Sequence, residues 1–165
     1  MKTSYDFHAS PVGTLLLAVN ERGLSHLHFD KGRGSLPIRP DWIHDPSRLD
    51  PVRAKLDAYF AGELQDFDLP LAPEGTDFQL AVWNELVKIP YGETTSYGAI
   101  ARTLGDITAS RAVGAANGQN PIAIIVPCHR VIGSSGKLVG YGGGLPIKKF
   151  LIDLEQRHRV FALTP

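Results

Sequence analysis

The sequence contains a single cysteine, Cys128, among its 165 residues. One cysteine excludes a disulfide within the chain and is too few for a cysteine-rich zinc site. Long apolar runs are also missing, and the stretch "MKTSYDFHASPVGTLLLAVNERG" at the start has only a short apolar run between charges. We therefore expect neither a signal peptide nor a membrane span, and a reducing, cytoplasmic location.

The chain has no net charge, because 17 Lys and Arg balance 17 Asp and Glu. The two halves differ, however: residues 1–76 carry 8 basic and 11 acidic side chains, and residues 77–165 carry 9 and 6. The second half is therefore the one expected to meet phosphate groups. The excess is small, so the electrostatic contribution to nucleic-acid binding should be modest.

The first third of the chain has the pattern of a small antiparallel sheet. Residues 2–9, 14–20 and 23–29 are predicted strands joined by tight turns, and residues 30–47 are a predicted loop. In the third strand, "HLH" places two imidazoles on one face.

A helix is predicted over "DPVRAKLDAYFAG". Asp50 is its expected N-cap, Pro51 suits the first position, and Gly62 suits the position just past its end. Its expected apolar face consists of Val52, Leu56, Tyr59 and Phe60.

The stretch "LPLAPEG" is the best linker candidate. We place an α/β N-terminal domain at residues 1–70, a linker at 71–76 and a mainly α domain at 77–165. A resemblance described below implies that this second domain is catalytic and binds DNA.

Helical signals follow one another in the second half. Thr76 and Gln79 have capping-box spacing, and the apolar positions of this helix are Phe78, Val82 and Leu86. The next short helix lies in "YGETTSYGAIARTLG", with Ile100, Ala101 and Leu104 facing the core. "SRAVGAANG" predicts another, with Ser110 as its cap and Gly118 as its end. Two short helices in succession are typical of a helix-turn-helix, although many helical hairpins share this pattern.

The remaining segments surround Cys128. "AIIV", residues 123–126, is a predicted buried strand, and residues 133–144 form a glycine-rich loop without the GK[ST] of a phosphate-binding loop. The final helix has an expected apolar face of Ile147, Phe150, Leu151 and Leu154.

The sequence allows two interpretations of Cys128. A lone cysteine after an apolar run is most often a small buried hydrophobe. Cys128 is followed by His129, however, and Glu155 lies one turn after Leu151 near the apolar side of the last helix. A thiol, a base and a carboxylate are the components of nucleophilic catalysis.

Three stretches, "NPIAIIVPCHRVIG", "TDFQLAVWNELVKIPYGETTSYGAIA" and "SRAVGAANGQNP", resemble the O6-alkylguanine-DNA alkyltransferases. The resemblance is close over residues 76–156 and extends only to the layout of the first 70 residues. It implies a ribonuclease H-like N-terminal domain with a small antiparallel sheet and a helix, followed by a winged helix-turn-helix-like domain. It also implies irreversible, single-turnover transfer of the alkyl group from O6-alkylguanine, and from O4-alkylthymine, to the cysteine, with flipping of the damaged base.

The resemblance assigns a role to each matching residue. It implies that Cys128 is the nucleophile, that His129 is a base acting through water, and that Glu155 orients His129. Asn120 is expected to brace the active-site turn, and Tyr97 to contact the base and donate a proton.

The same resemblance assigns residues that bind DNA. It makes Arg111 a finger that fills the gap left by the extruded base, and Tyr97 a contact to the neighbouring phosphate. The small side chains of the second helix, including Ala112 and Ala115, suit a close approach to the minor groove without reading sequence. Ser134 is a further candidate for a phosphate contact.

The expected pocket consists of the Cys128 and Val131 carbonyls and of Tyr141, Gly142 and Gly143. Some relatives carry a serine where this chain has Gly142, which leaves the accepted size of alkyl group open. The expected partner is double-stranded DNA containing O6-alkylguanine, bound by a monomer. No cofactor, metal or membrane is expected, although His8, His26, His28 and His44 are present in the first half.

Competing functions remain open. A non-catalytic alkylguanine-binding protein is disfavoured by the presence of Cys128. A thiol hydrolase would use Cys128, His129 and Glu155 but leaves Arg111 without a purpose. A winged-helix regulator would need base-reading side chains, and "AVGAAN" has almost none.

Overall fold

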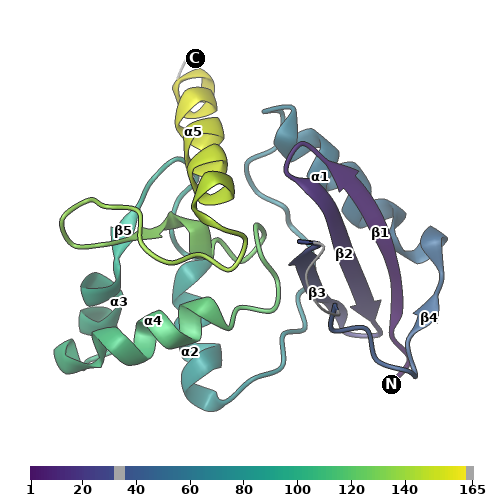
Figure 1. Cartoon of the computed structure of the whole chain (residues 1–165), viewed down its shortest axis with the longest axis horizontal. Coiled ribbons are helices and arrows are strands. Elements are labelled where there is room, and N and C mark those ends of the chain that lie inside the picture. Colours follow the sequence, from purple (N-terminus) through teal and green to yellow (C-terminus); the bar gives the residue numbers. More distant parts are fainter. Residues whose placement is uncertain (32–35, 163–165) are drawn as a thin grey trace. The chain divides into compact units, whose positions relative to one another are not determined.

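The structure is a computed structural model that describes residues 1–31 and 36–162, with side chains described as far as Arg159. The chain consists of two compact units (Figure 1): Met1–Glu74 with Pro121–Ala123, and Gly75–Asn120 with Ile124–Pro165. Within the described part, no helix is long and apolar enough to cross a membrane.

The first unit is built on a four-stranded sheet of order β3-β2-β1-β4. Strands β1 (Ser4–Ser10), β2 (Gly13–Asn20) and β3 (Gly23–Phe29) are antiparallel neighbours, as predicted, and the short β4 (Ile43–His44) adds in parallel to β1. Strand β4 falls in the predicted loop 30–47, of which residues 32–35 lie outside the described part. Leu15, Leu16, Leu17 and Ala18 are all buried, so both faces of the central strand are covered.

The outer edge of β3 is closed by two short stretches of chain. Leu24 N–H donates to the Pro70 carbonyl at 2.9 Å, and Leu27 N–H donates to the Pro121 carbonyl at 2.9 Å. A Cβ on Gly23 would stand 2.3 Å from the Pro70 oxygen, so only glycine allows this approach. The two stretches satisfy backbone groups that an open edge would expose.

Helix α1 (Asp50–Phe60) covers one face of the sheet, where Arg53 pairs with Asp6 and His8 bonds Asp57 at 2.7 Å. Its predicted cap is wrong: a 3-10 turn, η1 (Pro46–Leu49), precedes it, so Asp50 is its first residue rather than its N-cap. Gly62 does follow the helix in a left-handed conformation, with φ +76°.

The opposite face carries a small cluster in which Trp42 packs on Leu16 and Ala18. The His26 and His28 rings stack at 5.6 Å, as the "HLH" pattern predicts, and His26 lies 4.8 Å from the Trp42 ring. His8 and His44 pair with Asp57 and Asp6 instead. The described residues contain no group of three or more side chains suited to hold a metal ion.

His26 should make the folded protein less stable in acid. Burial, followed by the charges of His28 and Arg39, lowers the pKa of His26 to about 4. The folded state favours neutral His26, so this stabilisation is complete above the ordinary pKa near 6.5 and is lost as pH falls towards 4. His26 is partly exposed, so solvent screens part of this effect, and His26→Phe should lose about 1–2 kcal/mol less stability than the unchanged protein between pH 6.5 and 4, measured by urea unfolding at each pH. Parallel stability curves for the two proteins would contradict it.

The second unit is mainly helical. Helix α2 (Asp77–Leu86) begins with the predicted capping box, in which Gln79 N–H donates to Thr76 Oγ1 at 3.1 Å and Thr76 N–H donates to Gln79 Oε1 at 2.9 Å. Val82 and Leu86 are buried as predicted, but Phe78 is 39% exposed and Trp83 is buried in addition. The Trp83 indole N–H donates to the Ala116 carbonyl at 2.8 Å, which ties α2 to α4.

Helices α3 (Tyr97–Thr103) and α4 (Ser110–Gly118) occupy the predicted helix-turn-helix positions. The 3-10 turn η2 (Ile107–Ala109) leads directly into α4, so Ser110 is not the N-cap that we expected. Strands β5 (Thr95–Ser96) and β6 (Val131–Ile132) pair in parallel. This pairing places the start of α3 beside the segment that follows Cys128.

Residues 123–126 are buried, as predicted, but they do not form the predicted strand. Its residues form a buried turn in which Ile124 has φ +71°, and Ile122 makes only an isolated bridge to Leu27. The final helix, α5 (Leu145–Ala162), is present, but Phe150 is 38% exposed. Its buried side chains include Lys148 and Glu155, both charged residue types.

Candidate active site

Cys128 lies at the start of a single 3-10 turn, η3 (Cys128–Arg130). The turn begins after Pro127, and Cys128 N–H donates to the Val126 carbonyl at 2.8 Å. Cys128 is buried, and so are the next two residues. A tight turn at this point directs three consecutive polar or reactive side chains into the interior of the unit.

Two asparagines brace this turn. Asn120 Nδ2 donates to the Val126 carbonyl at 2.8 Å, and its side chain also hydrogen-bonds Cys128. Asn117, at the end of α4, directs its Nδ2 to the Cys128 carbonyl at 3.5 Å. The structure therefore places Asn120 where the sequence predicted it, and it adds Asn117.

His129 and Glu155 come together across 26 positions of sequence. His129 Nε2 lies 2.6 Å from Glu155 Oε2, and both side chains are almost fully buried. With Nε2 donating to the carboxylate, Nδ1 carries the lone pair of the neutral imidazole. That Nδ1 atom is buried and meets no hydrogen-bond partner among the described residues. His129 is thus arranged as a base whose free nitrogen points away from Glu155.

Arg130 completes this buried group. Its Nε donates to Glu155 Oε1 at 2.7 Å and its Nη2 donates to Glu155 Oε2 at 3.1 Å. Its Nη1 donates to the Ile89 carbonyl at 2.7 Å. The guanidinium also lies 5.7 Å from the centre of the Tyr91 ring. Two basic partners therefore share one carboxylate.

Burial and charge act on the ionisation of these groups in opposite directions. Burial disfavours the carboxylate, but the charge and hydrogen bond of His129 and those of Arg130 outweigh it and lower the pKa of Glu155 to about 2. Burial lowers the pKa of His129 despite Glu155. Burial also raises the pKa of Cys128, against the hydrogen bond from Asn120. The resting state is a neutral thiol beside a neutral imidazole and an ionised carboxylate, so the thiol needs a base before it can attack.

Two tyrosines lie close to the thiol. Tyr141 hydrogen-bonds Cys128, and burial, then the nearby thiolate charge, hold its own pKa well above the usual value. Tyr97 donates to the Val139 carbonyl at 3.3 Å, and burial, followed by the charge of Cys128, raises its pKa. Both hydroxyls therefore stay protonated and can act as donors.

The remaining predicted pocket residues lie on the loop that follows η3. The Val131 carbonyl accepts from Lys148 Nζ at 2.6 Å, and a Cβ on Gly142 would meet nothing within 4 Å. Gly142 is exposed, so this side of the loop is open.

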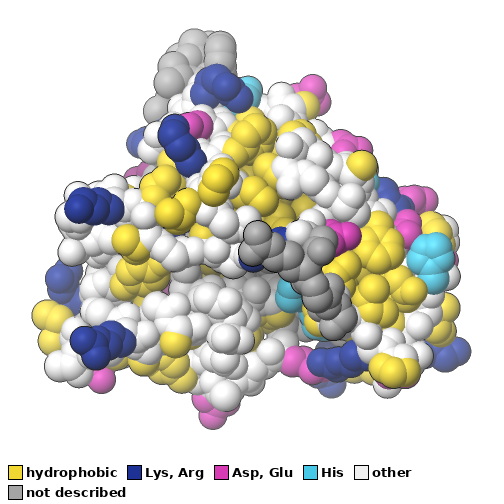
Figure 2. All heavy atoms as spheres, in the orientation of Figure 1, with side chains coloured by type: hydrophobic (Ala, Val, Ile, Leu, Met, Phe, Trp, Pro, Cys, Tyr) yellow, Lys and Arg dark blue, Asp and Glu magenta, His cyan; other side chains and the backbone are white. Residues whose placement is uncertain are grey.

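Apart from Tyr97, the predicted DNA-binding residues are exposed on the surface. Arg111, Ala112 and Ala115 are exposed on α4, and Ser134 is exposed in the turn after β6. Figure 2 shows Lys and Arg side chains spread over the part of the second unit that holds α3 and α4. The outward face of α4 is thus made of small residues with one arginine in its first turn.

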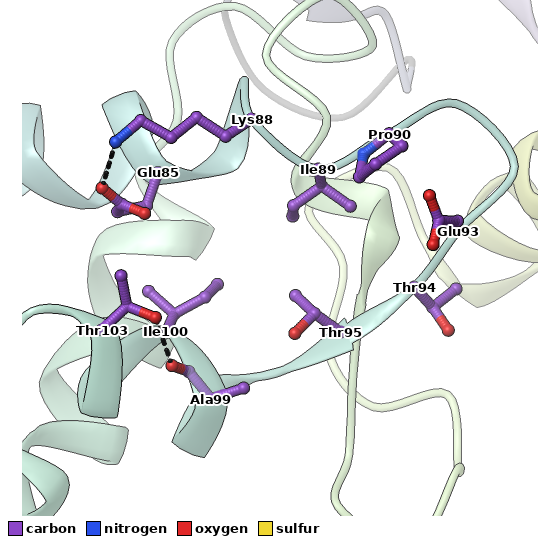
Figure 3. Close-up of a pocket in the computed structure, with 10 residues that line it drawn as sticks. All are labelled: Glu85, Lys88, Ile89, Pro90, Glu93, Thr94, Thr95, Ala99, Ile100 and Thr103. Carbon is purple, nitrogen blue, oxygen red and sulfur yellow. Dashed lines mark hydrogen bonds and ion pairs between the residues drawn. The ribbon is translucent and has the colours of Figure 1, made fainter.

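A separate pocket of about 310 Å³ lies between the end of α2 and the start of α3 (Figure 3). Ile89 and Ile100 line it together with Thr95, and Lys88 pairs with Glu85 at 2.7 Å at its side. None of the predicted site residues line this pocket.

Four contributors to the site escaped prediction: Asn117, Arg130, Tyr91 and Lys148. Arg130 stands within the "PCHRV" motif, so its position beside His129 was the one available signal. Lys148 and Asn117 gave none, because a lysine or an asparagine on a helix is ordinarily solvated.

Models of two families match almost the whole chain. The 6-O-methylguanine DNA methyltransferase ribonuclease-like domain matches residues 3–73, and the DNA binding domain of the same enzyme matches residues 77–157. The family that the sequence resembles and the expected fold class are both confirmed.

Individual relatives agree with these models. The chain is 56% identical over 154 residues to a methylated-DNA–protein-cysteine methyltransferase of Methanosarcina barkeri, covering 93% of this chain and 98% of the relative. It is 52% identical over 155 residues to the protein of that name from Mycobacterium tuberculosis, covering 94% and 93%. The crystal structure of Mycobacterium tuberculosis O6-methylguanine methyltransferase superposes with a TM-score of 0.88 at 51% identity, covering 94% of each chain, and a structure from that organism in complex with DNA matches equally well. The chain therefore belongs to the 6-O-methylguanine DNA methyltransferase family.

Proposed function

We propose that this protein repairs alkylated DNA by transferring the alkyl group from O6 of guanine, and from O4 of thymine, to Cys128. The observation that carries the proposal is the buried Cys128 next to a His129–Glu155 pair at 2.6 Å, in a chain whose relatives bear the name methylated-DNA–protein-cysteine methyltransferase. The transfer is irreversible, so each molecule acts once. No cofactor takes part.

The chemistry is a displacement at the alkyl carbon. His129 takes the thiol proton through a water molecule, and Glu155 stabilises the imidazolium that forms. The sulfur of Cys128 then bonds the alkyl carbon as the bond from that carbon to O6 breaks, and the electron pair stays with guanine. Guanine gains a proton from the Tyr97 hydroxyl, and the His129 imidazolium returns a proton to Tyr97. The net result is a thioether on Cys128 and an unmodified guanine that stays in the DNA strand, with the thiol proton transferred to that guanine.

Asn120 holds the thiol for this attack. Its amide bonds both the Val126 carbonyl and Cys128, so the turn and the sulfur are fixed by one side chain. Preorganisation of this kind lowers the entropic cost of reaching the attacking geometry.

The damaged base reaches Cys128 by leaving the helix, because O6 cannot be attacked inside a stacked duplex. The exposed small face of α4, with Ala112 and Ala115, enters the minor groove, and Arg111 fills the gap that the base leaves. Tyr97 and Ser134 contact the backbone. Binding of this kind ignores sequence, and a monomer suffices for it.

The flipped base enters a pocket made largely of backbone. The carbonyls of Cys128 and Val131 accept from the exocyclic amino group, and the loop amides at Gly142 and Gly143 donate to O6 beside Tyr141. The open space at Gly142 leaves room for groups larger than methyl.

The proposal also assigns the parts of the chain. Residues 77–165 carry the reaction and the DNA-binding surface, residues 71–76 link the parts, and residues 1–70 form the α/β domain. We place the reaction in the cytoplasm.

The test is to follow the methyl group. We expect a duplex carrying radiolabelled O6-methylguanine to label the unchanged protein with one equivalent of methyl, and peptide mapping to find the label on Cys128. Cys128→Ala should show no transfer. Several equivalents repaired per molecule would indicate a hydrolase, and tight binding without transfer would indicate a recognition protein; either result overturns the proposal.

A further inference from the structure

Lys148 is a buried lysine without a carboxylate partner in the described part of the chain. It lies near the start of α5, and its side chain is 0% exposed. Its Nζ donates to the carbonyls of Val131 at 2.6 Å, Val139 at 3.0 Å and Gly140 at 3.4 Å. Burying an ammonium group is costly unless the site repays it, and three carbonyl dipoles at one point are an arrangement built for a cation.

These three carbonyls stand on either side of a turn at residues 133–136, in the first part of the glycine-rich loop. Val131 precedes the turn in which Gly136 N–H donates to the Gly133 carbonyl at 2.9 Å, and Val139 and Gly140 follow that turn. One ammonium group therefore holds the two sides of this turn together. The pocket residues assigned above lie on either side of that junction.

The charges around Cys128 give Lys148 a second role. Arg130 and Glu155 neutralise one another through contacts of 2.7 and 3.1 Å. Burial favours neutral His129, and both Tyr97 and Tyr141 keep their protons. Lys148 donates to the carbonyl of Val131, three residues after Cys128, and forms an ion pair with no carboxylate among the described residues, so it is the positive charge beside this turn that no acid neutralises.

We propose that Lys148 is a positioning residue for the transfer reaction, clamping the loop and supplying the counter-charge to the Cys128 thiolate. The inference rests on the proposed function for its role in alkyl transfer, but the thiolate and the clamp can be tested without any substrate. Consistent with it, the Lys148 charge opposes the rise that burial causes in the pKa of Cys128.

The test uses iodoacetamide, which reports on the thiolate of Cys128 alone because the chain has no other cysteine. Lys148→Met keeps the length and apolar stem of the side chain and removes its charge, and Lys148→Arg keeps a charge. We expect the pH midpoint of Cys128 carboxamidomethylation to rise by about one unit in Lys148→Met, which is a roughly tenfold slower reaction below the midpoint. Lys148→Arg should keep a midpoint near that of the unchanged protein. Lys149→Met, an exposed neighbour paired with Asp153, is the matched control and should change nothing.

A purely structural role for Lys148 predicts a different pattern. It would lower the rate equally at every pH, or leave the rate intact, and in neither case would the midpoint move. If Lys148→Met folds and the pH midpoint of Cys128 carboxamidomethylation does not move, the proposal that Lys148 is the counter-charge is overturned.

A second measurement uses the unchanged protein, in case Lys148→Met does not fold. Coupling between two charges is reciprocal, so capping Cys128 with iodoacetamide must alter Lys148. We expect the pKa of Lys148, followed by the 13C shift of its Cε, to fall after the thiol is capped, and identical titrations before and after would overturn the proposal. Neither measurement needs DNA or alkylguanine. Failure of methyl transfer from the labelled duplex would thus count against the proposed function alone.

Discussion

Glu155→Gln is expected to lower the free energy of unfolding by about 3–5 kcal/mol, because it leaves a buried guanidinium without its counter-ion. Glu155 is 1% exposed and accepts from His129 at 2.6 Å and from Arg130 at 2.7 and 3.1 Å. The amide keeps the shape of the side chain but not its charge. Urea denaturation followed by circular dichroism at pH 7 measures the loss.

The same substitution should slow alkyl transfer, since His129 loses the carboxylate that stabilises its imidazolium form. We expect the rate with free O6-benzylguanine to fall about 100-fold or more, in the range found when a base loses its contribution. Asp153→Asn provides the control, because Asp153 is an exposed acid on the same helix and, among the described residues, its ion pair is with Lys149 at 2.6 Å. That control should stay within about 0.5 kcal/mol of the unchanged protein. A Glu155→Gln protein as stable as the control would show that the buried group contributes nothing to folding.

The stabilisation that Glu155 provides should be lost at low pH. The folded-state pKa of Glu155, about 2, lies below its ordinary value of 4.5. Its stabilisation is therefore complete above the ordinary value and is lost as pH falls from there through about 2. The unchanged protein should lose stability across this window, whereas Glu155→Gln should lose less.

Arg111→Ala is expected to reduce repair of duplex DNA by about 10- to 100-fold, which corresponds to the few kcal/mol that an extruded base costs. Arg111 is exposed in the first turn of α4, so its loss should leave the fold unchanged. Free O6-benzylguanine needs no base flipping, and its reaction with Cys128 should change less than about threefold. Single-turnover rates with the two substrates measure the difference.

Arg157→Ala, an exposed arginine on α5, is the matched control and should repair the duplex at the unchanged rate. Equal losses with duplex and with free O6-benzylguanine would show that Arg111 acts on the thiol or the fold and not as a finger in DNA.

Local patterns predicted local features well. The Thr76 and Gln79 spacing predicted a capping box that the structure contains, and Gly62 takes the left-handed position after α1. These features depend on a few neighbouring residues and on backbone conformations that their side chains favour. The caps at Asp50 and Ser110 failed because a 3-10 turn runs into each helix, which a capping pattern does not reveal.

Periodicity predicted most of the buried helix positions, among them Val82, Leu86 and Leu151, but it misplaced the margins of the covered faces. Phe78 and Phe150 fit the helical period yet are 39% and 38% exposed, while Trp83 and Lys148 take the buried positions. A helix face is buried only where another element packs on it, and that element is often distant in sequence. The turn at residues 123–126 shows the same limit: an apolar run predicted its burial, but Ile124 adopts φ +71° instead of a strand conformation.

The sequence by itself determined the family, the α/β and helix-turn-helix classes, the small-sided surface of α4, and Cys128 with His129 at its side. Each is written in contiguous residues or in a short motif. Only the tertiary structure decided that Glu155 is shared by His129 and Arg130, and that Lys148 is buried on three carbonyls. The reason is physical: a buried charge is tolerated only where distant backbone and side-chain groups converge on it, and no local pattern encodes that convergence.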